Sequence, residues 1–166
     1  MNATQYNESV RLYADGLYRF ILKNIKGVED ARDIVQNAFE VLWVKRNEVD
    51  VEKAKSYLFT VAYHKMIDHI RKNKRVHLVE EMPERIGGQS YPSQPDLKRI
   101  LSAALDQLPP IQKQLVLLKD YEGYSYQEMA QITGLSDSQV KVYLFRARNT
   151  LKKCLMQLEQ HKVNTP

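Results

Sequence analysis

A stretch near the C-terminal end of the chain carries two sets of helix-capping residues, one on each side of a glycine turn. Ser125 and Glu128 have the spacing of a capping box, in which each side chain binds the backbone N–H of the other residue. Ser136 and Gln139 repeat this spacing further along. Gly134 lies between the two boxes and tolerates the positive φ of a tight turn. The stretch therefore predicts a helix-turn-helix, a motif whose second helix enters the major groove of duplex DNA.

The second helix of this motif has two different faces. An apolar stripe at helical spacing predicts the buried side, made of Val140, Leu144, Ala147, Leu151, Leu155 and Leu158. Candidate DNA contacts lie elsewhere on the helix, at Ser138, Gln139, Lys141, Val142, Phe145 and Arg146. An apolar residue here can contact a thymine methyl, and the cations can bind guanine edges or phosphates. The alternative is that Val142 and Phe145 pack on another part of the same protein.

The charge of the chain is unevenly distributed. The formal net charge is +5 over 166 residues. Residues 1–76 and 97–166 each carry +4, whereas residues 77–96 carry −3. Two basic segments separated by an acidic one favour two modules that bind polyanions.

The acidic segment also marks a boundary between domains. Residues 81–95 contain three prolines, two glycines and two serines, without helical or strand periodicity. This composition predicts an extended linker over 77–96, between domains at 1–76 and 97–166. The apolar spacing on both sides predicts an all-α fold. Helices are expected at about 5–25, 28–46, 53–74, 96–107, 110–120, 125–133 and 136–160.

Several classes of protein are disfavoured by the sequence. No apolar run approaches the length of a membrane span, and the N-terminus is too polar for a signal peptide, so a cytoplasmic protein is expected. The single cysteine, Cys154, lies on the buried stripe and is expected to be a structural thiol. The four histidines do not cluster at ligand spacing, and no phosphate-binding glycine loop is present. We therefore expect no metal, no cofactor and no catalytic residues.

The helix over 28–46 has aromatic residues on its polar side. Its apolar stripe comprises Ala31, Ile34, Ala38, Val41 and Leu42. The other side carries Asp33, Gln36, Phe39, Glu40 and Trp43. Aromatic residues among charges are typical of protein-binding surfaces. The alternative is that a neighbouring helix covers Phe39 and Trp43.

The helix over 53–74 has a mixed aromatic and basic face. Its core side comprises Leu58, Phe59, Ala62, Met66 and Ile70. The other side carries Tyr57, Thr60, His64, Arg71 and Lys72. Aromatic rings can stack on unpaired bases while cations hold phosphates, which suits single-stranded nucleic acid. The alternative is an ordinary solvated face.

These motifs resemble those of the extracytoplasmic-function (ECF) subgroup of sigma-70 family sigma factors. Residues 30–39, D-A-R-D-I-V-Q-N-A-F, are similar to the D-A-x-D-x-x-Q-x-x-F signature of region 2. The face of the helix over 53–74 resembles the promoter-melting region that follows. The segment from Leu108 to Arg148, with its helix-turn-helix, resembles region 4. The resemblance spans nearly the whole chain.

The resemblance implies a set of roles and partners without any catalysis. Core RNA polymerase would be bound at its clamp, on the largest subunit, through Asp33, Gln36, Phe39, Glu40 and Trp43. The single-stranded −10 element would be bound by Tyr57, Thr60, His64, Arg71 and Lys72. The C-terminal domain would lie near the polymerase flap and read the −35 duplex. The family also commonly has an anti-sigma factor, which in some relatives is membrane-bound.

The chain departs from the family pattern where promoter sequence is read. Tyr63 and His64 replace the usual Arg-Asn pair, and Val142-Tyr143 replaces the usual Ser-Arg pair. The preferred promoter is therefore expected to differ from that of relatives with the usual residues. The competing function is a stand-alone helix-turn-helix regulator, which would bind duplex DNA without polymerase, usually as a dimer.

Overall fold

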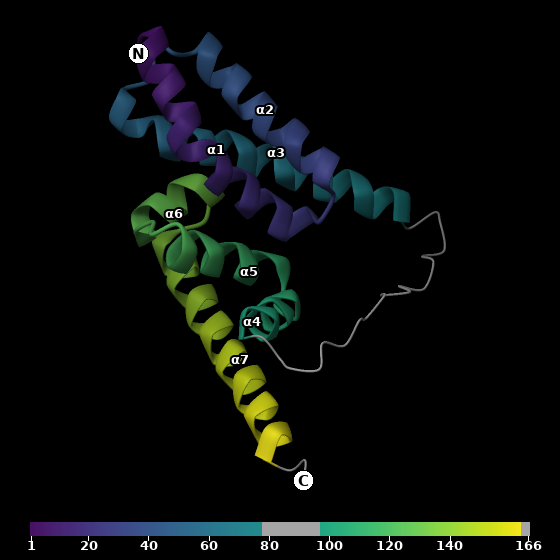
Figure 1. Ribbon diagram of the computed structural model, residues 1–166. Coiled ribbons are helices and arrows are strands. Elements are labelled where there is room, and N and C mark those ends of the chain that lie inside the picture. Colours follow the sequence, from purple (N-terminus) through teal and green to yellow (C-terminus); the bar gives the residue numbers. More distant parts are fainter. Residues whose placement is uncertain (78–96, 164–166) are drawn as a thin grey trace.

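The computed structural model of the chain describes residues 1–77 and 97–163, and all regular structure within these ranges is helical (Figure 1). This confirms the predicted all-α fold. The linker expected over 77–96 lies outside the described residues, except for His77, which is the last residue of a helix.

The N-terminal part forms a bundle of three long helices. These are α1 (Ala3–Ile25), α2 (Val28–Val44) and α3 (Ala54–His77), with a short 3-10 turn, η1 (Val51–Lys53), before α3. The helix α1 begins earlier than the apolar spacing predicts, because Asn2 and Gln5 form a capping box. The C-cap that follows its last residue is Lys26, whose φ of 64° lies in the left-handed region. This residue reverses the chain so that α2 can pack back on α1.

The C-terminal part contains shorter helices followed by one long helix. These are α4 (Leu97–Asp106), α5 (Pro110–Val116), η2 (Leu117–Tyr121), α6 (Tyr126–Thr133) and α7 (Asp137–Val163). Pro110 lies in the first turn of α5, as predicted, where its missing N–H removes no helical hydrogen bond. The element η2 is a π-helix, which the sequence predicted only as the continuation of the helix over 110–120.

The two groups of helices share one continuous hydrophobic core. The helix α3 packs on α6, and α1 contacts α5, so the C-terminal helices lie directly against the N-terminal bundle (Figure 1). At the centre, the ring of Phe59 lies 5.6 Å from the ring of Phe20 and 5.4 Å from the ring of Tyr124. We call this packing of the two groups the closed arrangement.

The long helix α7 extends away from the body of the molecule (Figure 1). Its predicted buried stripe is confirmed at Val140, Leu144, Ala147 and Leu151. Beyond that point Leu155 is only half-buried, and the side chain of Leu158 lies outside the described residues. The thiol of Cys154 is half-buried rather than part of the core, and its Sγ lies 3.3 Å from Oε1 of Gln107.

Candidate nucleic-acid and polymerase interfaces

The helices α6 and α7 form the predicted helix-turn-helix, and both capping boxes are present. The hydroxyl of Ser125 accepts a hydrogen bond from the N–H of Glu128 at 3.1 Å, and the Glu128 carboxylate accepts one from the N–H of Ser125 at 3.2 Å. Ser136 and Gln139 make the same pair of bonds at 3.1 and 3.0 Å. Gly134 ends α6 with a φ of 78°. These local contacts fix the residues at which both helices begin and the turn between them.

The residues predicted to contact the −35 duplex are all exposed in α7. They are Ser138, Gln139, Lys141, Val142, Phe145 and Arg146. The exposed fraction is 45% for Val142 and 67% for Phe145. The alternative, that these two side chains pack on another part of the protein, is therefore wrong within the described residues. Two large apolar side chains are thus available to a partner on a basic helix.

Aromatic rings lie beneath two cations of this face. The Nζ of Lys141 lies 5.9 Å from the ring centre of Tyr126, and the Cζ of Arg146 lies 6.0 Å from that of Tyr143. At exposed sites such contacts contribute about 0.5–1 kcal/mol. They orient the cations but are weak enough to be exchanged for a phosphate or a base.

The predicted −10 face of α3 is exposed from the middle of the helix towards its C-terminal end. His64, Arg71 and Lys72 are exposed, whereas Tyr57 and Thr60 are half-buried. The hydroxyl of Thr60 donates to the carbonyl oxygen of residue 56 at 2.7 Å, so it is engaged within its own helix. Cations near the end of α3 are also favoured by the helix dipole. This part of α3 has the side chains that are accessible to a DNA strand.

The predicted polymerase face of α2 is only partly exposed. Asp33, Gln36 and Glu40 are exposed, and Trp43 is 40% exposed. Phe39 is only 8% exposed, which agrees with the alternative that α1 covers it. The covering residue is Tyr6, whose hydroxyl donates to the Phe39 carbonyl at 3.0 Å.

Tyr6 also supports the indole of Trp43. The ring centres of Tyr6 and Trp43 lie 4.9 Å apart in an edge-to-face arrangement. The Cζ of Arg46 lies 4.0 Å from the centre of the same indole ring. Such packing restricts the ring while leaving part of it in solvent. The sequence stripe alone did not distinguish the buried Phe39 from the exposed Trp43, because the difference depends on where Tyr6 lies.

The contact between the two helical groups contains polar residues that the sequence analysis missed. The hydroxyl of Tyr63 donates to Oε1 of Gln114 at 2.8 Å, and both side chains are buried. The Nζ of Lys55 donates to the Glu122 carbonyl oxygen at 3.1 Å. Tyr63 follows Phe59 by one helical turn, and this spacing is the signal that could have placed it on the core side. In this structure it contacts the C-terminal helices instead of facing a DNA strand.

Replacing Tyr63 by phenylalanine is expected to lower the free energy of unfolding by about 1–2 kcal/mol, because Oε1 of Gln114 loses its buried donor. Chemical denaturation followed by circular dichroism measures the change. Tyr124→Phe is the matched control. No described group lies within hydrogen-bonding distance of the buried Tyr124 hydroxyl, so its removal is expected to be neutral or stabilising. Equal destabilisation by both variants would contradict this role for the Tyr63 hydroxyl.

The pH dependence of stability, compared between the parent protein and Tyr63→Phe, gives a second test of the buried Tyr63 hydroxyl. Burial raises the pKa of Tyr63 from 10.0 to about 12. The folded state therefore holds the protonated phenol, and the stability from this group is complete below pH 10 and lost between pH 10 and 12. Over that range the stability of the parent protein is expected to fall more steeply than that of Tyr63→Phe.

Among the side chains that the structure describes, no group of three or more His, Cys, Asp or Glu residues is arranged to hold a metal ion. Within residues 1–77 and 97–163, every helix is too short or too polar to cross a membrane.

Comparison with known sequences gives two matches along the chain. Residues 10–76 match the family model for sigma-70 region 2, and residues 98–151 match that for sigma-70, region 4. The ECF RNA polymerase sigma factor SigM of Bacillus subtilis (strain 168) is 30% identical over 152 residues, which cover 88% of this chain and 92% of SigM. The RNA polymerase sigma factor SigV of the same organism is 30% identical over 137 residues, covering 81% of each protein.

A solved structure gives the same result. The sigma factor RpoE from Bartonella quintana, crystallised with the anti-sigma factor NepR, has a TM-score of 0.74 and 25% sequence identity. The match covers 91% of this chain and 96% of that chain. The chain therefore belongs to the ECF subgroup of the sigma-70 family, the non-enzymatic RNA polymerase subunits that direct promoter-specific initiation of transcription.

Proposed function

We propose that the chain divides promoter recognition between a domain at residues 1–76 and a domain at residues 97–166, joined by a linker over 77–96. The first domain binds core polymerase and the unwound −10 strand, and the second reads the −35 duplex. The observation that carries this proposal is the exposed face of α7, where Val142 and Phe145 are 45% and 67% exposed. The division is supported by the two family matches, because the first ends at residue 76 and the second begins at residue 98.

The polymerase surface in this proposal is the exposed side of α2. Asp33, Gln36 and Glu40 supply polar contacts to the clamp of the largest subunit, and Trp43 supplies the apolar anchor. Exposed aromatic residues with restricted rings are frequent hot spots, because they lose little conformational freedom on binding. Phe39 supports this surface indirectly, because its buried ring packs with Tyr6 beneath the exposed side chains. The flap contacts the second domain.

The −10 surface in this proposal is the outer side of α3. His64 stacks on an unpaired base, and Arg71 and Lys72 hold phosphates. Tyr57 and Thr60, which are half-buried, contribute where the strand reaches the start of the helix. The −35 surface is the face of α7 that carries Ser138, Gln139, Lys141, Val142, Phe145 and Arg146.

An anti-sigma factor is a further partner in this proposal. The similar sigma factor RpoE was crystallised in complex with one, NepR. We expect such a partner to compete with polymerase for the exposed surfaces of this chain.

Run-off transcription with core polymerase and a promoter library tests the proposal. A sigma factor with these surfaces is expected to start transcripts from one class of promoter, with paired −10 and −35 elements. The alternative, a stand-alone regulator, predicts tight duplex binding without polymerase and no new transcripts. Recovery of duplex-binding activity alone would therefore overturn the proposal.

The polymerase surface has its own test. Asp33→Ala and Gln36→Ala are each expected to weaken binding to core polymerase by about fivefold, on the order of 1 kcal/mol, without unfolding the domain, because both side chains are exposed. Fluorescence anisotropy with labelled protein measures the affinity. Glu29→Ala on the first turn of α2 is a control of similar charge. If both variants fold and bind as tightly as the parent, the polymerase lies elsewhere.

A further inference from the structure

The closed arrangement brings the proposed −10 and −35 surfaces close together. The helix α6 packs on α3, and α7 packs on α6. The helix α3 has 24 residues and is therefore about 36 Å long, while the part of α7 from its first residue to Arg146 is about 15 Å long. Even if they are placed end to end, these two lengths and the width of α6 reach only about 60 Å.

Promoter DNA holds its two elements further apart than this. The positions that give the elements their names differ by about 25 base pairs, which is about 85 Å of B-DNA at 3.4 Å per base pair. Even a smooth bend of about 90° leaves the ends of such a duplex roughly 75 Å apart. The closed arrangement therefore cannot contact both elements of one promoter at the same time.

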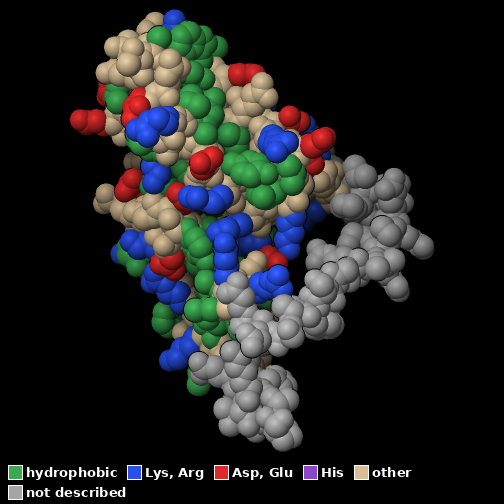
Figure 2. Space-filling view, viewed as in Figure 1, with side chains coloured by type: hydrophobic (Ala, Val, Ile, Leu, Met, Phe, Trp, Pro, Cys, Tyr) green, Lys and Arg blue, Asp and Glu red, His purple; other side chains and the backbone are tan. Residues whose placement is uncertain are grey.

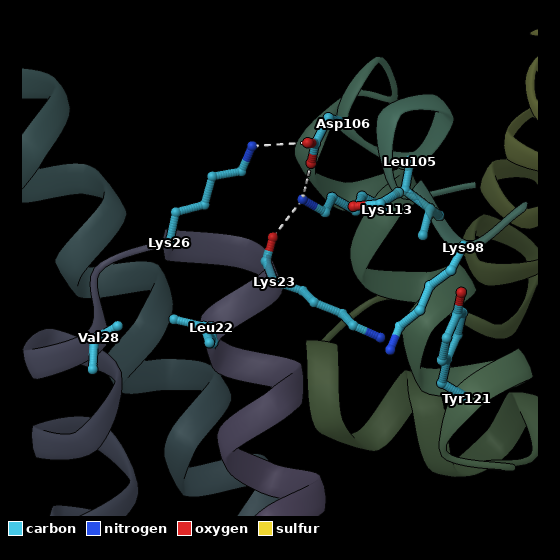
Figure 3. Close-up of a pocket in the computed structure, with 10 residues that line it drawn as sticks. Leu22, Lys23, Lys26, Val28, Lys98, Leu105, Asp106, Lys113 and Tyr121 are labelled. Atoms are coloured by element: carbon cyan, nitrogen blue, oxygen red, sulfur yellow. Dashed lines mark hydrogen bonds and ion pairs between the residues drawn. The ribbon is translucent and has the colours of Figure 1, made fainter. Parts of the chain in front are cut away.

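Polar contacts lie at the edge of the junction between the two helical groups. On the face seen in Figure 2, Lys and Arg side chains gather where the upper and lower helices meet. The Asp106 carboxylate on α4 accepts from Lys26, which follows α1, at 2.9 Å and from Lys113 on α5 at 2.7 Å (Figure 3). The Nζ of Lys113 also donates to the carbonyl oxygen of Lys23 on α1. A polar edge of this kind is typical of domain interfaces that can separate.

A buried hydrogen bond also crosses the junction. The hydroxyl of Tyr63 on α3 donates to Oε1 of Gln114 on α5 at 2.8 Å, and the two side chains are only 4% and 2% exposed. If either partner is lost while the groups stay together, the other remains buried without a hydrogen bond, which is costly. Exposed ion pairs contribute far less. We call this bond the Tyr63–Gln114 latch.

We propose that the closed arrangement is a self-inhibited state of the chain, held by the Tyr63–Gln114 latch and released when core polymerase draws the two groups apart. Polymerase can do so because its clamp and its flap bind one group each in the proposed function, on which this inference rests. The apparent affinity for a promoter is then the affinity of the open form, reduced by the fraction of molecules that are open.

The first test is energy transfer between dyes on the two groups. The dyes are attached at Glu29→Cys on α2 and Lys152→Cys on α7, both exposed, in a Cys154→Ser background. Gln114→Leu and Tyr63→Phe each break the latch and are expected to raise the ratio of open to closed molecules about tenfold. The double variant is expected to return towards the parent, because both partners are then apolar. Core polymerase is expected to open the parent.

Gln112→Leu is the matched control for Gln114→Leu. It makes the same change on the same helix, at a buried side-chain oxygen for which the described residues supply no hydrogen-bond donor. The control is expected to leave the ratio of open to closed molecules unchanged. Opening by Gln112→Leu equal to that by Gln114→Leu, or no opening by either, would overturn the latch.

The second test is run-off transcription at limiting concentrations of the chain. Gln114→Leu is expected to reach half-maximal transcription at about a tenfold lower concentration than the parent, because a larger fraction of its molecules is open. An unchanged half-maximal concentration in a variant that opens would overturn self-inhibition. Absence of transcripts with the parent and with every variant would instead count against the proposed function, and energy transfer would still decide whether the latch holds the groups together.

Discussion

Replacement of Phe59 by alanine is expected to lower the free energy of unfolding by about 3–5 kcal/mol, the largest change predicted for this protein. Phe59 is 1% exposed, and its ring contacts Phe20 in the N-terminal bundle and Tyr124 in the C-terminal helices. Truncation would leave a cavity at the point where the two groups meet, and the surrounding side chains would relax only partially into it.

Urea denaturation measures this effect. The chain contains one tryptophan, Trp43 on α2, so indole fluorescence reports on the N-terminal bundle, while circular dichroism reports on all helices. Phe145→Ala is the matched control, because it makes the same chemical change at a side chain that is 67% exposed. The control is expected to change stability by less than about 0.5 kcal/mol. Similar losses in both variants would show that Phe59 does not join the two groups.

Replacement of Arg146 by alanine is expected to weaken −35 binding by about 1–3 kcal/mol, or roughly 5- to 150-fold, and to relax preference at one base pair. Arg146 is exposed on α7 near Val142 and Lys141, and its guanidinium lies 6.0 Å from the ring centre of Tyr143. Because it is exposed and this ring contact is weak, its guanidinium is expected to reorient to meet a guanine edge. Selection of −35 variants by the polymerase complex measures the preference.

Arg148 provides the control for Arg146, because its guanidinium donates to the Asp120 carboxylate at 2.9 Å and is thus already engaged by another side chain. Arg148→Ala is expected to leave base preference unchanged. Uniform weakening across sequences by Arg146→Ala, with a flatter salt dependence, would mean that Arg146 holds a phosphate. Val142→Ser is expected to shift the preferred base without loss of stability. An unchanged preference in that variant would mean that another face of α7 enters the groove.

Much of the helical structure and one of the three surfaces could be predicted from neighbouring residues. The capping boxes at Ser125 and Ser136 and the left-handed turn at Gly134 depend on groups within four residues of one another. The exposed face of α7 also follows from local spacing, because a single continuous stripe determines which side is buried. These features lie where they were expected, because the donors and acceptors of each cap are close together in the sequence.

Other features depend on residues far apart along the chain. Tyr63 and Gln114 are separated by 51 residues, and Tyr6 and Phe39 by 33. A helical stripe specifies that a face is apolar, but not which helix covers it. The sequence therefore did not place Tyr63 in the core, and it left two alternatives open for Phe39. The hydrogen bond from Lys55 to the Glu122 carbonyl has the same origin, because these residues are 67 positions apart and belong to separate helical groups. Periodicity and capping thus account for the helices, whereas the burial of Tyr63 and the contact of Lys55 with Glu122 arise from packing between α3 and α6 and between α1 and α5.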